Sequence, residues 1–175
     1  NALEIIKPYD PVCDCTDNFP TRYLINDACL ILSKPNVYGS IERFQGQATV
    51  FNLDKSSPNL RDLIAEPPPA ELLPTCAEAG VMGVLPGIIG LIQATEAIKI
   101  ITRLGKTLSG RLLIFDALSM KFREIQIKQK QNQPIIKELI EYEGFCFQPS
   151  QIKNISVANF KELLETQSDK IFLID

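Results

Sequence analysis

The sequence predicts an α/β fold in which helices flank a mixed β-sheet, and three patterns support that class. First, an apolar segment at 11–13 runs directly into an acidic turn and then a helix-like segment, the order of a strand–turn–helix unit. Second, two strand-like runs follow at 36–41 and 46–53, and a hairpin pattern spans 111–128. Third, a long apolar run with helical spacing covers 81–104. Apolar residues make up 45% of the 175 residues, which is enough for a hydrophobic core.

The first elements follow from local signals. Residues 3–7 are expected to be the end of a helix or a loop, and residues 9–15 a buried parallel strand. Residues 19–33 place apolar side chains at helical spacing, with Pro20 in the first turn, where a helix tolerates proline. A Lys-Pro pair at 34–35 ends this helix.

A proline-rich loop separates the central strands from the next helix. Residues 54–75 hold five of the twelve prolines, three of them consecutive at 67–69, which enforces an extended path. Loops of this length inside a domain are usually functional or mobile.

The segment 81–104 is the longest predicted helix and is rich in small residues. These recur at three- and four-residue steps, as Gly80, Gly83, Gly87, Gly90, Ala94 and Ala97. Each glycine inside a helix costs about 1 kcal/mol relative to alanine, so we expect this smooth stripe to pack closely on a sheet or a partner. The uncharged run at 79–95 is short for a bilayer and contains proline, so a buried helix is expected rather than a membrane span.

The C-terminal part divides into a linker and the start of another unit. Strands are expected at 111–116 and 121–128, a polar connection at 129–134, and a short helix with a return segment at 135–146. Composition changes at 148–154, after which a capped helix pattern and a strand follow. We therefore expect one domain over 1–147, a linker over 148–154 and the beginning of a second domain over 155–175.

Composition excludes several classes of function. The net charge is −3 without a long basic run, which disfavours nucleic-acid binding. The chain has no histidine, which excludes Ser-His-Asp and Cys-His nucleophile pairs within it. Its five cysteines form no C-x-x-C, so no zinc site is expected. Free thiols without a disulfide pattern are typical of the reducing cytoplasm, and the N-terminus resembles no signal peptide.

The nine residues 14–22 (DCTDNFPTR) carry the clearest functional signal. Ligands of open α/β sheets bind at the carboxyl ends of strands, where this turn is predicted to lie. An aspartate there can hold Mg²⁺ against phosphate oxygens, and an asparagine can hydrogen-bond a nucleotide. Asp17 and Asn18 are equally suited to cap the following helix, so both interpretations stay open from the turn alone.

Three motifs together carry a family resemblance. The segments 14–22, 39–47 (GSIERFQGQ) and 74–80 (PTCAEAG), the last continuing to GVLPG at 83–87, occur in the order found in the ThiF-type, ubiquitin-activating-enzyme-like adenylyltransferases. Within that family the chain most resembles the molybdopterin-synthase adenylyltransferases. The likeness covers about residues 1–146, and the tail from 155 to 175 resembles the start of a rhodanese domain.

The resemblance implies an activity and a partner. The family uses ATP and Mg²⁺ to adenylate the C-terminal glycine of a ubiquitin-fold sulfur-carrier protein ending in Gly-Gly, for molybdopterin or thiamine biosynthesis. It also implies a Rossmann-like fold and a homodimeric parent protein. Asp17 matches the Mg²⁺–ATP aspartate and Asn18 the adjacent nucleotide-contacting position.

Cys76 matches a motif cysteine that is proposed to form a thioester or persulfide with the carrier. The alternative for Cys76 is a small buried residue without a chemical role, as free cysteines usually are. We assign Cys13, Cys15 and Cys29 to the core. Cys146 has no assigned role. Arg22 could contact phosphate or pair with Asp14 or Asp17, and a structural salt bridge is the expected role. Arg43 is expected in a loop after a strand, where partner binding is possible.

Two departures from the family pattern limit these expectations. The stretches 57–63 and 132–136, where many members carry zinc-binding C-x-x-C pairs, have no cysteine, which again predicts no zinc. The sequence contains no G-x-G-x-x-G, so we expect it to be the C-terminal half of the domain and inactive alone. A non-catalytic carrier-binding or dimerisation module, a dehydrogenase fragment, and a cut chain without independent function are the alternatives; the Asp-Asn pair argues against the dehydrogenase.

Overall fold

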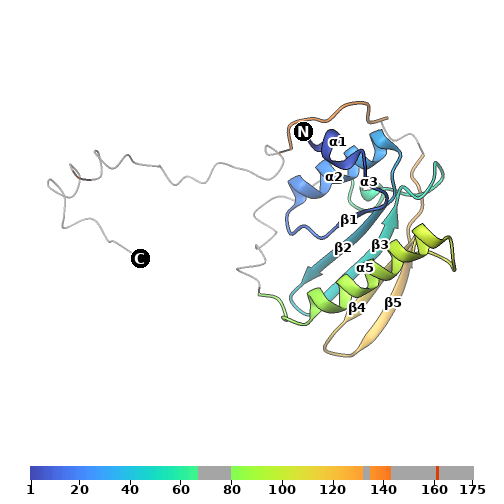
Figure 1. Cartoon of the computed structure of the whole chain (residues 1–175). Coiled ribbons are helices and arrows are strands. Elements are labelled where there is room, and N and C mark those ends of the chain that lie inside the picture. Colours follow the sequence, from blue (N-terminus) through green and yellow to red (C-terminus); the bar gives the residue numbers. More distant parts are fainter. Residues whose placement is uncertain (67–79, 132–134, 143–160, 162–175) are drawn as a thin grey trace.

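A computed structural model describes residues 1–66, 80–131, 135–142 and 161 of the chain. Its centre is a five-stranded sheet with the strands in sequence order. β1 and β2 are parallel, and the other three neighbouring pairs are antiparallel. This mixed sheet confirms the predicted α/β class (Figure 1). The strands are β1 (Val12–Asp14), β2 (Asn36–Glu42), β3 (Gln45–Phe51), β4 (Arg111–Asp116) and β5 (Lys121–Gln126).

Helices lie on both faces of the sheet (Figure 1). On one face, α2 (Phe19–Leu32) connects β1 to β2, with α1 (Ala2–Ile6) packed against it and α3 (Leu60–Leu63) nearby. A core cluster there joins side chains of α2 and α3 to β2, β3 and β4. On the other face, α5 (Leu85–Thr102) packs across β2 and β3 over two further clusters.

The predicted helix at 19–33 is confirmed nearly residue for residue as α2. Its N-cap is Asn18, whose side chain accepts a hydrogen bond from the Thr21 N–H, and its proline lies in the first turn. Ser33 ends the helix in the left-handed region with φ of 53°. These signals are local, so the sequence alone could reveal both ends.

The first strand is shorter and more exposed than the expected buried strand at 9–15. It spans three residues and pairs only with β2 in the described part of the chain, so it lies at an edge of that sheet. Cys13 and Cys15 are consequently exposed, and their assignment to the core was wrong. Cys29 on α2 is fully buried as predicted, and this burial raises the pKa of its thiol to about 12.

The hairpin at 111–128 is confirmed as β4 and β5, but the expected short helix after it is wrong over the described residues 135–142, which have no regular structure. This segment is held by side chains instead, since Tyr142 is buried in the core. Within the predicted loop at 54–75, the one-turn helix α3 forms because Asn59 and Asp62 make a reciprocal capping box.

The long helix α5 begins at Leu85 and not at 81, because its proline occupies the first turn. Its length and composition would suffice to cross a membrane. Only 22% of it is buried among the described residues, so the expectation of a buried helix is wrong for its outer face. The inner face packs on the sheet, while Leu91, Ile98 and Ile101 stay more than half exposed.

The close packing expected from the glycine stripe has a different origin. Added Cβ atoms at Gly83, Gly87 and Gly90 would meet no described atom within 4 Å, so these glycines do not serve close approach to the described parts of the chain. The glycines that bring α5 near the sheet are on the strands. A Cβ at Gly39 would lie 2.4 Å from Gln93 of α5, and one at Gly46 would lie 2.4 Å from Ile89.

Candidate functional site

The candidate site lies where β1 ends and α2 begins. β2 runs parallel to β1, whereas β3, β4 and β5 alternate in direction, so five chain segments lie toward this end of the sheet. They are the ends of β1, β2 and β4 and the beginnings of β3 and β5. This end of the sheet is therefore the carboxyl end of the parallel strands β1 and β2. The sequence predicts that the turn at 14–22 lies at such an end.

Asp14 shapes the turn from inside. It is completely buried, and its Oδ1 accepts hydrogen bonds from the Thr16 N–H (3.0 Å) and hydroxyl (2.7 Å). Its Oδ2 has no hydrogen-bond partner among the described residues. A buried carboxylate oxygen without a donor is costly, which makes this atom the most unusual one at the strand end.

Of the two roles that the sequence left open, the structure shows helix capping, by Asn18, and the Mg²⁺–nucleotide role stays a prediction. Asn18 is the N-cap, and its Oδ1 accepts the Thr21 N–H at 2.9 Å. Its amide nitrogen donates to Oδ1 of Asp17 at 3.2 Å. Asp17 is exposed beside the helix start, so its carboxylate faces solvent where the helix N–H groups favour negative charge.

Arg22 has a structural role, but not the predicted salt bridge. The side chain is 5% exposed and donates to the Gly39 carbonyl at 2.9 Å and to the Thr16 carbonyl. Its guanidinium carbon also lies 4.9 Å from the centre of the Tyr38 ring. Arg22 therefore joins the turn to the end of β2 through backbone carbonyls, which sequence spacing could not indicate.

Gln93 is a residue that the sequence analysis missed. It is buried, and its Nε2 donates to the carbonyls of Asp14 (2.8 Å) and Val37 (3.0 Å). Its Oε1 accepts from the Cys15 thiol at 3.4 Å. One side chain of α5 thus fixes the ends of two strands beneath the site. A glutamine within an apolar helical run was the only signal for it in the sequence.

A small polar cavity opens at the same end of the sheet as the turn at 14–22. It measures about 280 Å³ and includes Glu42, Arg43 and Asp116 among its lining residues. Arg43 lies in the β2–β3 turn with φ of 49°, its side chain is exposed, and its carbonyl accepts the Met82 N–H at 2.9 Å. The predicted position of Arg43 in a loop after a strand is confirmed, and its suggested partner-binding role stays a prediction.

A second polar cluster lies deep under α2 and is separate from the site. Asp27 is fully buried and accepts hydrogen bonds from Arg61 at 2.7 Å and from the Tyr142 hydroxyl at 2.8 Å. The Asp27 carboxylate raises the pKa of Arg61. Burial first, and then the bond to Asp27, raise the pKa of Tyr142 well above its usual range. Because each charge has its partner, the cluster is structural.

Two predicted features lie outside the described residues. They are Cys76 with its surrounding motif, and the tail assigned to a rhodanese start apart from the exposed Lys161. Cys146 lies outside them as well. The domain boundaries and the role of Cys76 therefore stay predictions.

Comparison with known proteins gives a consistent pattern. The model of the ThiF family matches residues 1–136. The chain is 50% identical over 149 residues to a protein of Mycobacterium tuberculosis named probable adenylyltransferase/sulfurtransferase MoeZ, covering 83% of this chain and 38% of the relative. It is 46% identical over 156 residues to the sulfur carrier protein adenylyltransferase of Thermus thermophilus, covering 83% and 58%.

A mammalian relative matches over more of the chain. The adenylyltransferase and sulfurtransferase MOCS3 of Sus scrofa is 40% identical over 190 residues, covering 98% of this chain and 42% of the relative. The chain thus spans less than two thirds of the length of the curated relatives it matches.

Solved structures agree on the fold. Escherichia coli MccB with MccA-N7isoASN gives a TM-score of 0.60 at 8% identity, covering 79% of this chain and 44% of that one. MccB with ATP gives 0.59 at 9% identity, covering 77% and 42%. At this identity the likeness establishes that the chain shares the fold of MccB, and it says nothing about ligands of this chain.

Proposed function

The chain belongs to the ThiF family, and from that premise we propose that it forms part of an ATP-dependent adenylyltransferase. The substrate is the C-terminal glycine of a ubiquitin-fold sulfur-carrier protein ending in Gly-Gly, in molybdopterin or thiamine biosynthesis in the cytoplasm. The names of the relatives MoeZ, MOCS3 and sulfur carrier protein adenylyltransferase support this activity. The observation that carries the proposal is the exposed Asp17 carboxylate at the strand end and helix start.

The residues at this strand end fit Mg²⁺ and the nucleotide phosphates. Asp17 supplies the hard carboxylate oxygen that Mg²⁺ takes together with substrate phosphates. When bound, the cation offsets the negative charge that develops as the carrier carboxylate attacks the α-phosphorus of ATP and pyrophosphate departs. Asn18 holds Asp17 through one amide hydrogen and keeps the other available for the nucleotide. Arg22 and Gln93 hold the backbone around this strand end in place through hydrogen bonds to the carbonyls of Gly39 and Asp14.

The test compares two aspartates in a polypeptide that joins this chain to a glycine-rich phosphate loop. Asp17→Asn should lower ATP–pyrophosphate exchange with a Gly-Gly carrier by on the order of a hundredfold, because a charge-matched ligand is lost. Asp10→Asn, an exposed aspartate at the opposite end of β1, should leave exchange unchanged. Equal loss in both variants would contradict the assignment, and so would robust exchange by this 175-residue chain alone.

Further parts of the proposal concern the rest of the chain. Cys76 is proposed to form a thioester with the carrier, its thiolate attacking the carrier's acyl-adenylate and AMP leaving. Residues 155–175 are proposed to begin a rhodanese-like domain after a linker at 148–154. We propose no zinc site. Mass measurement of the carrier-loaded parent protein with ATP, with and without Cys76→Ala, tests the covalent role. A carrier-linked species present in both proteins would refute that role for Cys76.

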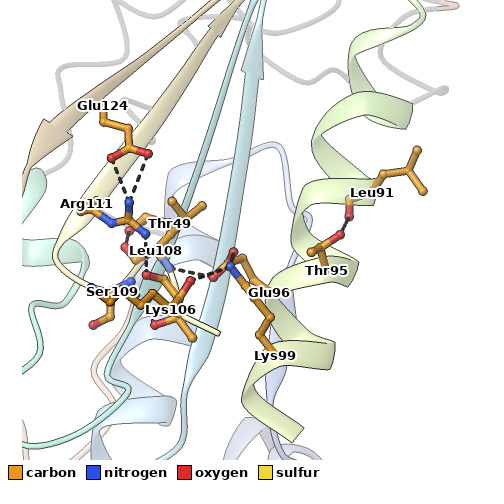
Figure 2. Close-up of polar contacts among 11 residues, drawn as sticks. Thr49, Leu91, Thr95, Glu96, Lys99, Lys106, Leu108, Ser109, Arg111 and Glu124 are labelled. Carbon is orange, nitrogen blue, oxygen red and sulfur yellow. Dashed lines mark hydrogen bonds and ion pairs between the residues drawn. The ribbon is translucent and has the colours of Figure 1, made fainter. Parts of the chain in front are cut away.

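We also propose that the outer face of α5 joins two copies of the chain in a homodimer. Val84, Leu91 and Ile98 recur every seven residues and are 56%, 72% and 59% exposed. The Thr95 hydroxyl on this face donates to the Leu91 carbonyl at 2.8 Å, which leaves little polar surface there (Figure 2). A contiguous apolar face of this kind marks an interaction surface.

Light scattering after size exclusion tests this interface. Leu91→Glu with Ile98→Glu should convert the dimer to a monomer, because two charges would be buried without partners. The matched control is Leu118→Glu with Met120→Glu, which are 70% and 71% exposed in the β4–β5 turn, and it should stay dimeric. A monomeric parent chain that still captures a Gly-Gly carrier would favour the carrier-binding module instead.

A further inference from the structure

A larger cavity lies at the end of the sheet opposite the candidate site, where α5 ends and β4 begins. Its volume is about 530 Å³, within the range of small-ligand sites. Four of its nine lining residues are cationic and none is acidic, although the whole chain carries a net charge of −3. The cations are Lys99, Arg103, Lys106 and Arg111.

The wall of this cavity is fixed before any ligand arrives. Glu96 of α5 is 3% exposed and accepts the Leu108 N–H at 2.7 Å (Figure 2). The hydroxyl of Thr49 on β3 donates to the Leu108 carbonyl at 3.1 Å. Both contacts hold the backbone of the connection between α5 and β4 against the sheet, so this backbone need not become ordered on binding.

Two of the four cations are already paired. Lys99 forms an ion pair with Glu96 and donates to the Lys106 carbonyl at 2.8 Å. Arg111 pairs with Glu124 at 3.0 Å and donates to the Thr107 carbonyl at 2.8 Å. Figure 2 shows both side chains converging on this connection.

The other two cations have no carboxylate partner within the described residues. Arg103 and Lys106 are exposed and border the turn at Gly105. Cations favour the carboxyl end of a helix, but Lys99 in the last turn of α5 already serves that purpose. Arg103 and Lys106 follow the helix and leave a local excess of positive charge.

We propose that this cavity binds a small multivalent oxyanion, namely a phosphate or diphosphate group. Arginine and lysine supply the charge and donors that such a group requires. The Thr107 hydroxyl accepts the Ser109 N–H at 3.4 Å, which leaves its own hydrogen for a ligand oxygen. The cavity is partly open to solvent, and its two cations without a carboxylate partner among the described residues, Arg103 and Lys106, border the same short turn, which favours a compact anion over an extended acidic peptide. This cavity is separate from the proposed adenylation site, and anion binding there does not depend on adenylation activity.

The test follows amide resonances of the 175-residue chain during titration with sodium pyrophosphate. Shifts should concentrate at 99–111 and weaken as salt rises, since the contact is electrostatic. Arg103→Gln with Lys106→Gln should raise the dissociation constant about tenfold or more. The matched control, Lys121→Gln with Arg123→Gln on β5, removes the same charge elsewhere and should bind as the parent does.

Titration with AMP shows whether the cavity accepts any phosphate group or only a diphosphate. Similar shifts from AMP and pyrophosphate support a site for any phosphate, and shifts from pyrophosphate alone support a diphosphate site. No shift at millimolar pyrophosphate, or shifts confined to 14–22, would overturn the proposal. Equal weakening in both double variants, or binding of hexaglutamate without pyrophosphate, would also overturn it.

Discussion

Gly39 on β2 and Gln93 on α5 are in close contact where α5 crosses the sheet, and each limits which residue the other position can hold. The Gln93 side chain occupies the space that a Cβ on residue 39 would need, with its Cδ 2.4 Å from that position. It cannot move aside without losing its bonds to the carbonyls of Asp14 and Val37. A residue without a side chain is therefore required on β2, although Gly39 has an ordinary strand conformation.

Gly39→Ala should lower the free energy of unfolding by about 2 kcal/mol, because an added methyl group overpacks a fixed neighbour. Urea unfolding measures the change. Gly87→Ala is the control, since a Cβ there meets nothing within 4 Å, and it should stabilise the chain by up to about 1 kcal/mol through helix propensity. Opposite signs are expected, and loss of stability only in the helix variant would contradict the packing argument.

Among the elements, α2 and α3 are joined by one buried ion pair. Asp27 of α2 is 1% exposed at its side chain and Arg61 of α3 is 16% exposed, with 2.7 Å between them. The guanidinium carbon of Arg61 also lies 4.8 Å from the centre of the Tyr23 ring. A helix of one turn such as α3 has little stability of its own, so this pair and the capping box define its position.

Arg61→Leu should destabilise the chain by about 3 kcal/mol, because it leaves the Asp27 carboxylate buried without its cation. Arg123→Leu, on exposed β5, should change stability by less than about 0.5 kcal/mol. Denaturant unfolding of the two variants and of Asp27→Asn with Arg61→Leu provides the comparison. The double variant should recover part of the loss, and a failure to recover any would show that the ion pair is not the cause.

The same elements show which features the sequence could predict. Each end of α2 depends on residues next to it, Asn18 and Pro20 at the start and the Lys-Pro pair at 34–35 after the end, and both ends were predicted to within one residue. The role of Gln93 depends on a carbonyl 79 residues away, and that of Arg22 on one 17 residues away. Contacts over such separations leave no periodicity, so the turn at 14–22 could be found but not the side chains that fix it.

Exposure was the other feature that local pattern could not give. The apolar run of α5 predicted burial, whereas only one face of it packs on the sheet. Likewise Val12 and Cys13 read as a buried strand, but in the described structure β1 has a neighbour on one side only. An apolar sequence pattern predicts that a surface is covered, but it does not show whether the same chain or a partner covers it.

At the scale of the whole molecule, Tyr142 anchors the segment 135–142 to the core through Asp27. Its pKa is raised in the folded chain, and its value in the unfolded chain is near 10. The neutral phenol is therefore favoured by folding. Its contribution to stability is complete below about pH 10 and is lost as the pH rises from there toward the folded pKa.

Tyr142→Phe should reduce the free energy of unfolding by about 1 kcal/mol near pH 8, through loss of the hydrogen bond to Asp27. The difference from the parent should shrink above about pH 10, because the variant has no phenol to ionise. Urea midpoints measured from pH 8 to pH 11 check this convergence. A constant difference over that range would mean that the phenol does not titrate with unfolding.

The bonds of Gln93 also bear on how the molecule opens. One side chain joins α5 to the last carbonyl of β1 and to a carbonyl of β2, so the helix cannot leave the sheet without breaking a hydrogen bond to each strand. We expect these three elements to form one cooperative unit in native-state hydrogen exchange. Their slowest amides should share a single opening free energy, and the candidate site would persist only as long as that unit stays closed.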